Sequence, residues 1–239
     1  MYIPKLMEVN DFSKQADIIR SNPLGIIFSY AMPQNGFMGF IKGNETSAVD
    51  SEMCATHVPF VLVKEKNGKT KLVAHLAAKN QHIQMLEKYS KCMVVFQSVD
   101  SYVSPSWYPL KKKTHKYVPT WDFATVHVYG AAKIIRDKTW LLNMLGQLTD
   151  QEENKRPDGD EFEEKWKVSD APEKYVDTLL NGIVGLEIDV TDIQSKFKLH
   201  QNEAAVNVKG VLEGYEKEIG GCKTQELAKL TKENHPHSI

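Results

Sequence analysis

Residues 55–76, ATHVPFVLVKEKNGKTKLVAHL, contain two runs rich in β-branched and aliphatic residues on either side of Asn67-Gly68. An Asn-Gly pair between apolar runs is typical of a tight β-hairpin turn, because both residues tolerate positive φ. We therefore expect a strand from Ala55 to Lys64 to pair with one from Lys69 to Leu76. This hairpin predicts that the first half of the chain is mainly β structure.

Other strands and helices alternate around the hairpin, which predicts an α+β fold. The expected strands are Leu24 to Tyr30, Cys92 to Gln97, Ala124 to Ile135 and Ile183 to Val190. The expected helices are Asp11 to Ser21, Asn80 to about Tyr89, Asp137 through Leu148 and Asp170 to Asn181. A last helix is expected to carry Ala205, Val208, Leu212 and Tyr215 on one face, with Asn202 as its N-cap. In the strand 124–135, Thr125, His127 and Tyr129 share one face, which is polar enough to line a site.

Three segments lack a clear hydrophobic period. Residues 31–52 are rich in Gly, Asn, Ser and Met, and we expect an inserted loop there. Residues 150–164 are acidic and resemble a solvated linker. Residues 216–239 are polar and predict a flexible tail. The expected organisation is therefore one domain over residues 1–215, followed by the tail.

Composition excludes several classes of protein. The 239 residues carry a net charge of −1, so the basicity of a dedicated nucleic-acid binder is missing, although Lys111, Lys112 and Lys113 form a local basic run. Three widely spaced cysteines predict a reducing compartment and no disulfide framework. The sequence has no signal core and no apolar run of about 20 residues that would span a bilayer. We expect a cytoplasmic protein, with the nucleus as the alternative, and no membrane association.

The most unusual composition lies between Ser104 and Gly130, SPSWYPLKKKTHKYVPTWDFATVHVYG. Two aromatic clusters, Trp107-Tyr108 and Trp121-Asp122-Phe123, each follow a proline and a hydroxyl residue. Because proline fixes φ and has no N–H, we expect both clusters in rigid turns rather than in a central strand or a helix. The rings predict either a wall for a planar ligand or a plug at the end of a barrel.

Motifs of common enzymes are missing. The sequence contains no Walker loop, no G-x-G-x-x-G and no H-E-x-x-H. Cys54 and His57 have a C-x-x-H spacing and His75 lies on the paired strand, but a second pair of zinc ligands is missing, so we expect no metal site. Lys196 and Lys198 precede the last helix, where they would favour an anion or simply mark an exposed strand edge; the exposed edge is the preferred interpretation.

Several longer motifs, in their order along the chain, resemble the PaiB family of FMN-binding negative transcriptional regulators. They are Met1-Tyr-Ile-Pro4, Ala55-Thr-His-Val-Pro59, Ala74-His-Leu-Ala-Ala-Lys-Asn-Gln81, Ser104-Pro-Ser-Trp-Tyr108, Val118-Pro-Thr-Trp121, Val126-His-Val-Tyr-Gly130, Gly182-Ile-Val-Gly185 and Lys196-Phe-Lys-Leu-His-Gln-Asn202. The resemblance implies an FMN-binding split β-barrel with peripheral helices, related to pyridoxamine-phosphate oxidase and small flavin reductases. It also implies a homodimer with a flavin site near the subunit interface.

The resemblance places the FMN phosphate at the strand-to-helix turn from His75 to Asn80, with Lys79 as its cation. A lysine beside the start of a helix suits an anion on physical grounds as well. The resemblance places His57 and the segment Trp121 to His127 near the ring or the ribityl chain, and the Lys196–Asn202 motif would belong to the same site or to the partner subunit. The expected cofactor-binding residues are His57, His75, Leu76, Ala77, Lys79, Asn80, Ser104, Trp107, Tyr108, Thr120, Trp121, His127, Lys198 and Gln201.

The chain departs from the family pattern at residues 31–52, in its extended tail, and at His200, where serine is more usual. Three hypotheses about function follow. The chain is an FMN protein with oxidoreductase competence, a regulator that acts through a ligand or a protein partner, or a barrel that holds haem or another planar ligand through His57, His75 or His127. Direct binding to nucleic acid is not supported, and no catalytic residue is assigned.

Overall fold

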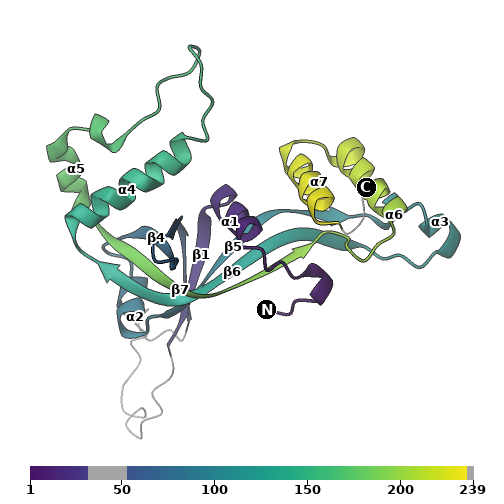
Figure 1. The fold of residues 1–239 in the computed structure, drawn as a ribbon, viewed down its shortest axis with the longest axis horizontal. Coiled ribbons are helices and arrows are strands. Elements are labelled where there is room, and N and C mark those ends of the chain that lie inside the picture. Colours follow the sequence, from purple (N-terminus) through teal and green to yellow (C-terminus); the bar gives the residue numbers. More distant parts are fainter. Residues whose placement is uncertain (32–52, 236–239) are drawn as a thin grey trace, which may run out of the picture. The chain divides into compact units, whose positions relative to one another are not determined.

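The computed structural model describes residues 1–31 and 53–235, and Figure 1 shows the fold. The chain forms two compact units. Unit 1 is made of Met1–Asn22, Phe96–His127 and Gln194–Ile239, and unit 2 of Pro23–Val95 and Val128–Ile193. Each unit is therefore assembled from segments that lie far apart in the sequence. Except for Ala31, the loop expected at residues 31–52 lies outside the described residues.

One seven-stranded sheet has the strand order β2-β1-β5-β6-β7-β4-β3. Its strands are β1 (Leu24–Tyr30), β2 (Met53–Pro59), β3 (Val61–Lys64), β4 (Thr70–Ala77), β5 (Lys91–Val103), β6 (Thr120–Ile135) and β7 (Ile183–Lys198). Strand β1 pairs antiparallel with β2 and β5, and β4 pairs antiparallel with β3 and β7. The expected α+β class is confirmed.

In unit 2 the sheet curls until its two edges come together. Strands β2 and β3 lie at opposite ends of the strand order, yet only Phe60 separates them in the chain. A flat sheet of seven strands would hold its edges many strand widths apart. The sheet is not closed by pairing between β2 and β3, and the expected split barrel is therefore confirmed.

The hairpin at Asn67-Gly68 is confirmed between β3 and β4. Gly68 has a φ of 84°, and the Glu65 N–H donates to the Lys69 carbonyl at 2.8 Å. The single strand expected from Ala55 to Lys64 is wrong, because the chain leaves β2 after Pro59 and starts β3 at Val61. Proline has no N–H for a ladder, and the Phe60 N–H donates instead to the Pro23 carbonyl at 2.9 Å.

Three α-helices of unit 2 confirm the sequence predictions. They are α2 (His82–Lys88), α4 (Lys138–Glu153) and α5 (Glu173–Leu180). Asp137 caps α4 by accepting from the Trp140 N–H at 2.7 Å, and α4 joins a buried apolar cluster with β3, β4 and α5. This helix runs to Glu153, so the first part of the segment 150–164 is helical rather than linker-like. There the Glu153 carboxylate accepts from Arg156 at 2.5 Å and from the Trp166 N–H at 3.0 Å.

Unit 1 holds α1 (Phe12–Ser21), α3 (Lys111–Thr114), α6 (Ala205–Gly214) and α7 (Cys222–Asn234). Helix α6 follows Ala204, so Asn202 is not its cap. The flexible tail expected from residue 216 contains α7, whose Leu227 is fully buried. The Lys14 ammonium donates to the Asn234 side chain at 2.7 Å, which ties α7 to the N-terminal segment. Thr224, Leu227 and Thr231 are buried at helical spacing, so α7 packs through one face although the segment is polar on average.

The strands β5, β6 and β7 are longer than the sequence pattern predicted. Strand β6 begins at Thr120, directly after Pro119, so the cluster Trp121-Asp122-Phe123 lies in a strand and not in a turn. Proline is compatible with this position because it precedes the first strand residue. The Trp107-Tyr108 cluster does lie in a turn, at the short 3₁₀ helix Pro105–Trp107.

Candidate functional site

The predicted cofactor-binding residues fall into two groups, one in each unit. Ser104, Trp107, Tyr108, Thr120, Trp121, His127, Lys198 and Gln201 belong to unit 1. His57, His75, Leu76, Ala77, Lys79 and Asn80 belong to unit 2.

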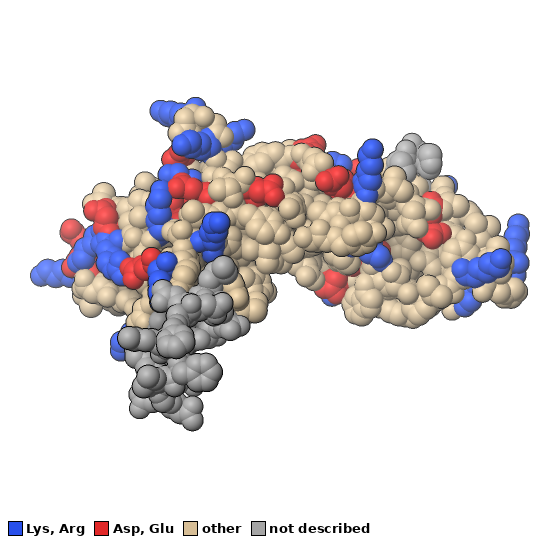
Figure 2. All heavy atoms as spheres, turned by 90° about the horizontal axis from the view of Figure 1, so that it is seen from below, with Lys and Arg blue, Asp and Glu red and all other residues tan. Residues whose placement is uncertain are grey.

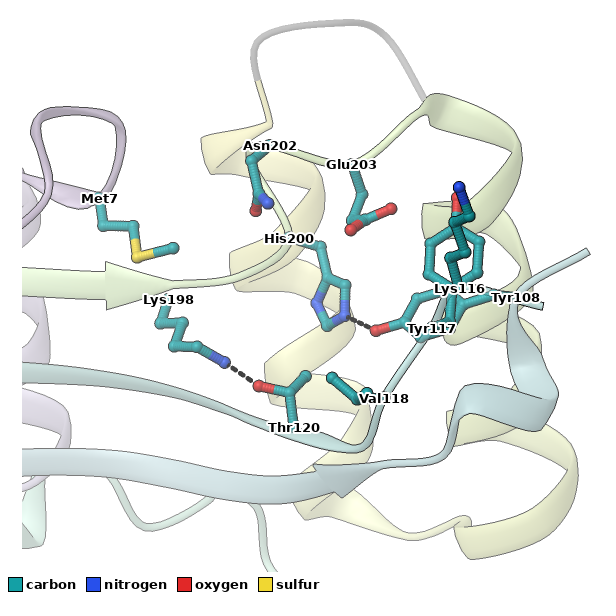
Figure 3. A pocket seen from close by; sticks show the side chains of 10 residues that line it. All are labelled: Met7, Tyr108, Lys116, Tyr117, Val118, Thr120, Lys198, His200, Asn202 and Glu203. Carbon is teal, nitrogen blue, oxygen red and sulfur yellow. Dashed lines mark hydrogen bonds between the residues drawn. The ribbon is translucent and has the colours of Figure 1, made fainter. Parts of the chain in front are cut away.

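A cavity of about 270 Å³ opens in unit 1 (Figure 3). Three segments supply its walls: the N-terminal segment, residues 108–120, and the chain that leaves β7. The lining residues are Met7, Tyr108, Lys116, Tyr117, Val118, Thr120, Lys198, His200, Asn202 and Glu203. We call this cavity the tyrosine–lysine pocket. Of the predicted residues, the structure brings Tyr108, Thr120 and Lys198 together here.

A chain of buried hydrogen bonds runs behind the pocket. The Tyr108 hydroxyl and His200 Nε2 are 2.6 Å apart, and His200 Nδ1 lies 2.8 Å from Asp122 Oδ2. The Tyr215 hydroxyl donates to the same Oδ2 at 2.7 Å. Because an ionised carboxylate only accepts, the bond to Asp122 places a proton on His200 Nδ1. In the neutral imidazole Nε2 is then an acceptor, and the Tyr108 hydroxyl donates to it.

Local backbone geometry presents His200 to this network. His200 has a φ of 65°, in the left-handed region, where histidine is more often found than most residues. The Gln201 side chain holds the turn: its amide nitrogen donates to the Phe197 carbonyl at 2.5 Å, and its oxygen accepts from the Leu199 N–H at 2.9 Å. Both ends of this predicted site residue are thus occupied by backbone.

Burial keeps the two phenols of the network protonated at neutral pH. The pKa of Tyr108 is raised, first by desolvation and then by the negative charge of Asp122. The pKa of Tyr215 is raised for the same two reasons. Tyr108 also stacks on Tyr117, with ring centroids 5.0 Å apart and 30° between the ring planes. The pocket therefore has an aromatic wall whose hydroxyl is held in a fixed direction.

Lys198 brings a positive charge into the pocket. Its ammonium donates to the Thr120 hydroxyl and, at 2.5 Å, to the Trp121 carbonyl. Desolvation lowers the pKa of Lys198, and Lys196 lowers it further, while Asp122 acts in the opposite direction. The charged form of a half-buried lysine is favoured when an anion approaches.

The other predicted residues of unit 1 do not line the tyrosine–lysine pocket. Ser104 caps the 3₁₀ turn by accepting from the Ser106 N–H at 3.2 Å. Trp107 is buried, and its ring meets that of Tyr215 edge to face at 5.7 Å. Trp121 is 53% exposed beside Tyr102. His127 lies in β6, and desolvation lowers the pKa of its imidazole.

In unit 2, the predicted phosphate turn follows β4. Leu76 is buried, whereas Ala77 and Lys79 are exposed. The Asn80 side chain accepts from the His82 N–H at 2.9 Å, as the predicted helix start requires. Lys79 makes no hydrogen bond or ion pair with the described residues, so its ammonium is available. His57 is exposed on β2 and pairs with Ile26 of β1.

A second cavity, of about 470 Å³, lies beside this turn in unit 2. Apolar and aromatic side chains from α4, α5 and the segment between them line it, including Trp166 and Tyr175, and His75 contributes from β4. Nδ1 of His75 is buried without a partner among the described residues, and desolvation lowers the pKa of the ring. Gly182 lines the cavity, and its carbonyl accepts from the Ala78 N–H at 2.8 Å. The cavity is therefore lined by His75, at the start of the turn, and by Gly182, which holds the backbone of Ala78.

Sequence reasoning missed the centre of the unit 1 network. Asp122 was seen only as part of an aromatic cluster, and His200 only as a departure from a family pattern. In β6, Asp122 lies on the same face as Ala124, Val126 and Val128, and all four side chains are buried. A buried acidic side chain needs a hydrogen-bonding partner. An acidic residue at every-second-residue spacing from apolar residues was therefore the sequence signal for a buried polar network. No comparable signal pointed to Lys116 or Glu203.

Cys54 and His57, in the part of the chain that the structure describes, are not placed to share a metal ion. Cys54 and His57 are three residues apart on β2, so their side chains point to opposite faces. Burial raises the pKa of the Cys92 thiol to about 12. Within residues 1–31 and 53–235, no group of three His, Cys, Asp or Glu side chains is arranged to hold a metal ion.

The open, curled sheet defines a split-barrel protein. In a comparison with known families, residues 1–192 match the family described as "Putative FMN-binding domain". The chain belongs to this family. FMN, the cofactor implied by the sequence resemblance, agrees with that description. Lys198 and Gln201 lie beyond the matched residues.

Two curated proteins are similar to this chain in sequence. "Uncharacterized protein YKL070W" of Saccharomyces cerevisiae is 55% identical over 166 residues, which cover 69% of this chain and 98% of that protein. "Protease synthase and sporulation protein PAI 2" of Bacillus subtilis is 28% identical over 218 residues, covering 91% and 90% of the two chains. The resemblance to the PaiB family is therefore confirmed.

Solved structures share the fold at low sequence identity. The conserved hypothetical protein Rv2991 from Mycobacterium tuberculosis is similar with a TM-score of 0.50 and 15% identity, over 82% of this chain and 90% of that chain. The flavocytochrome Anf3 from Azotobacter vinelandii has a TM-score of 0.50 and 12% identity, over 82% and 72%. Among the described residues, no helix has the length and apolar character needed to cross a membrane.

The residues of unit 2 fit FMN in chemical terms. A flavin mononucleotide combines a large planar ring system with a phosphate. The cavity beside His75 offers apolar and aromatic walls together with one buried ring nitrogen that lacks a partner. Lys79, four residues after His75, offers an exposed ammonium of the kind that binds phosphate.

Proposed function

We propose that this chain is an FMN-binding split-barrel protein of the PaiB type, with its phosphate site at the turn from Ala78 to Asn80. The observation that carries the proposal is the combination of Lys79, which has no partner among the described residues, with the cavity lined by His75 at the start of the same turn. The family match over residues 1–192 includes this whole turn and supports the choice of ligand.

Each part of the turn would have a distinct role. Lys79 would neutralise phosphate charge, and Asn80 would hold the turn in place through its bond to the His82 N–H. His75 would face the flavin as a neutral imidazole, since desolvation lowers its pKa. The apolar walls of the cavity would exclude water from the ring. Bound FMN supplies electron-transfer and hydride-transfer chemistry, which makes an oxidoreductase activity part of this proposal.

The alternative, regulation of transcription, would then operate through the bound ligand or a protein partner. On the face shown in Figure 2, acidic and basic side chains adjoin at the left, much of the middle is uncharged, basic side chains lie at the right end, and no broad basic stripe crosses the face. Direct DNA binding relies on such a stripe, because phosphate contacts supply most of the affinity. This face therefore offers no broad basic surface for direct reading of DNA.

Replacing Lys79 by alanine is expected to weaken FMN binding by about 1–3 kcal/mol, the scale of a lost charge-assisted hydrogen bond. The measurement is an equilibrium titration of the ligand-stripped protein, followed by flavin absorbance and fluorescence. Riboflavin, which has no phosphate, should bind weakly to both proteins. The matched control is Lys66→Ala, because Lys66 is another exposed lysine, in the loop between β3 and β4. Equal FMN affinity in Lys79→Ala and Lys66→Ala would show that Lys79 does not bind the phosphate.

We also propose that the protein is a homodimer. An apolar face of the sheet supports this: Ile26 lies beside His57 and Val95, and Phe28 beside Ala55 and Met93. Two residues at the end of this face, Tyr30 and Met53, are 47% and 65% exposed. Apolar patches of this kind on a sheet usually mark an interface.

Replacing Met53 by glutamate is expected to convert the dimer to a monomer, because a charge would be buried against apolar side chains. Light scattering coupled to size-exclusion chromatography measures the mass directly. Leu6→Glu is the control, since Leu6 is also 65% exposed but lies in the N-terminal 3₁₀ turn of unit 1. A dimer that survives Met53→Glu, or a monomeric parent protein, would contradict the proposed interface.

A further inference from the structure

The tyrosine–lysine pocket of unit 1 contains more positive than negative charge. Among its ten lining residues, Lys116 and Lys198 are basic and Glu203 is the single acidic residue. Glu203 already accepts from the Asn207 side chain at 2.9 Å. Neither lysine forms an ion pair with a carboxylate among the described residues. The pocket therefore favours a negatively charged occupant.

The hydrogen bonds of Lys198 leave one donor free. An ammonium group carries three N–H bonds, and the Thr120 hydroxyl and the Trp121 carbonyl accept two of them. Both acceptors are neutral, so they position the ammonium without cancelling its charge. Asp122 influences Lys198 through space only: its Oδ2 accepts from His200 and Tyr215, and its Oδ1 is buried without a hydrogen-bond partner among the described residues. A half-buried cation of this kind is stabilised by an oxyanion.

The remaining walls limit the size and the nature of the occupant. Figure 3 shows Lys198 and Thr120 on one side of the pocket and Tyr108, Tyr117 and Lys116 on another. The Tyr108 hydroxyl is held by His200, and the stacked rings of Tyr108 and Tyr117 form a flat surface. A volume of about 270 Å³ admits a small molecule but no polymer segment of any length.

We propose that the tyrosine–lysine pocket is a second ligand site, separate from the FMN site, that binds the carboxylate or phosphate group of a small organic anion. Lys198 binds the anionic group through its free N–H, Lys116 adds a second positive charge, and the tyrosine wall contacts the organic part. This site uses residues of unit 1, whereas the proposed FMN phosphate turn uses residues of unit 2. The two proposals therefore rest on different residues, and separate variants test them.

The test follows backbone amide signals of the ¹⁵N-labelled, flavin-stripped chain by NMR during titration with inorganic phosphate or benzoate. The amide signals of Thr120, Asn202 and Glu203 are expected to shift with one or both probes, and the preferred probe identifies the anionic group. Lys198→Met should weaken this binding about tenfold or more, which is the loss of a single charge-assisted contact. FMN affinity should stay unchanged in this variant.

Lys196→Met is the matched control. Lys196 lies on the same strand and the substitution changes the net charge equally, but its ammonium donates to the Tyr2 carbonyl and does not line the pocket. Lys116→Met, at an exposed position, replaces Lys198→Met if that variant does not fold. Equal affinity for the probes in Lys198→Met and Lys196→Met, or no shift at the pocket signals, would overturn the proposal. A parallel loss of FMN affinity in Lys198→Met would also overturn it, since the pocket would then hold the flavin phosphate.

Discussion

Replacing Asp122 by alanine is expected to lower the free energy of unfolding by about 3–5 kcal/mol. The carboxylate is fully buried and binds two partners, His200 and Tyr215, through Oδ2. Its removal would leave a buried imidazole N–H and a buried phenol without acceptors, and each such group carries a desolvation cost. The loss would also release Tyr108, whose hydroxyl is held by the same imidazole.

Denaturation with urea, followed by circular dichroism, measures this free energy. Asp17→Ala is the control, because Asp17 is exposed on α1 and substitutions of this kind usually change stability by less than about 0.5 kcal/mol. Asp122→Asn keeps an acceptor oxygen and is expected to lose less than Asp122→Ala. A decrease in the free energy of unfolding of less than about 1 kcal/mol in Asp122→Ala would mean that the network is exposed to water in solution. The inference that it fixes the direction of the Tyr108 hydroxyl would then be wrong.

The strand and helix positions that could be predicted from the sequence share a local cause. Asn67-Gly68 specifies a turn through its own backbone preferences, and Asp137 specifies a helix start through one hydrogen bond to a residue three positions later. Strand β1 was predicted with its observed bounds because Pro23 marks its beginning. Signals of this kind require no knowledge of the rest of the chain.

Predictions failed where distant residues decide the structure. Trp121 and Phe123 follow a proline and suggest a turn, yet they lie in β6 because neighbouring strands supply partners for their backbone. Helix α7 has a polar sequence, and burial of Leu227 within unit 1 orders it. Both outcomes depend on contacts with residues far away in sequence, which local propensity does not include.

The candidate sites divide in the same way. The turn carrying Lys79 was expected from a strand, a lysine and a helix cap that follow each other directly. The bond between Asp122 and His200 joins residues that are 78 positions apart. Only the fold brings Asp122 and His200 together. The sequence showed one part of this pair, an acidic residue on the buried face of a strand.

Replacing Gly210 by alanine is expected to destabilise unit 1 by about 2–3 kcal/mol. Gly210 lies in α6, where alanine normally stabilises a helix by about 1 kcal/mol relative to glycine. Here an added Cβ would lie 2.0 Å from the Trp107 carbonyl oxygen and 2.8 Å from Pro109 Cδ. The first contact is with backbone in the turn that precedes Tyr108, so relief requires that α6 or this turn moves. The cost of that movement exceeds the gain in helix propensity.

Gly146→Ala provides the opposite case in the same chain. Gly146 lies within α4, and an added Cβ would meet nothing within 4 Å, so this variant is expected to gain about 1 kcal/mol. The two substitutions are chemically identical and both lie in helices, so the difference in their unfolding free energies isolates the contact between α6 and the Trp107 turn.

The prediction extends to ligand binding. A displaced Trp107 turn moves Tyr108 as well, so Gly210→Ala should weaken anion binding in the tyrosine–lysine pocket, while Gly146→Ala leaves it intact. Equal stability of the two variants would mean that α6 does not pack on this turn in solution.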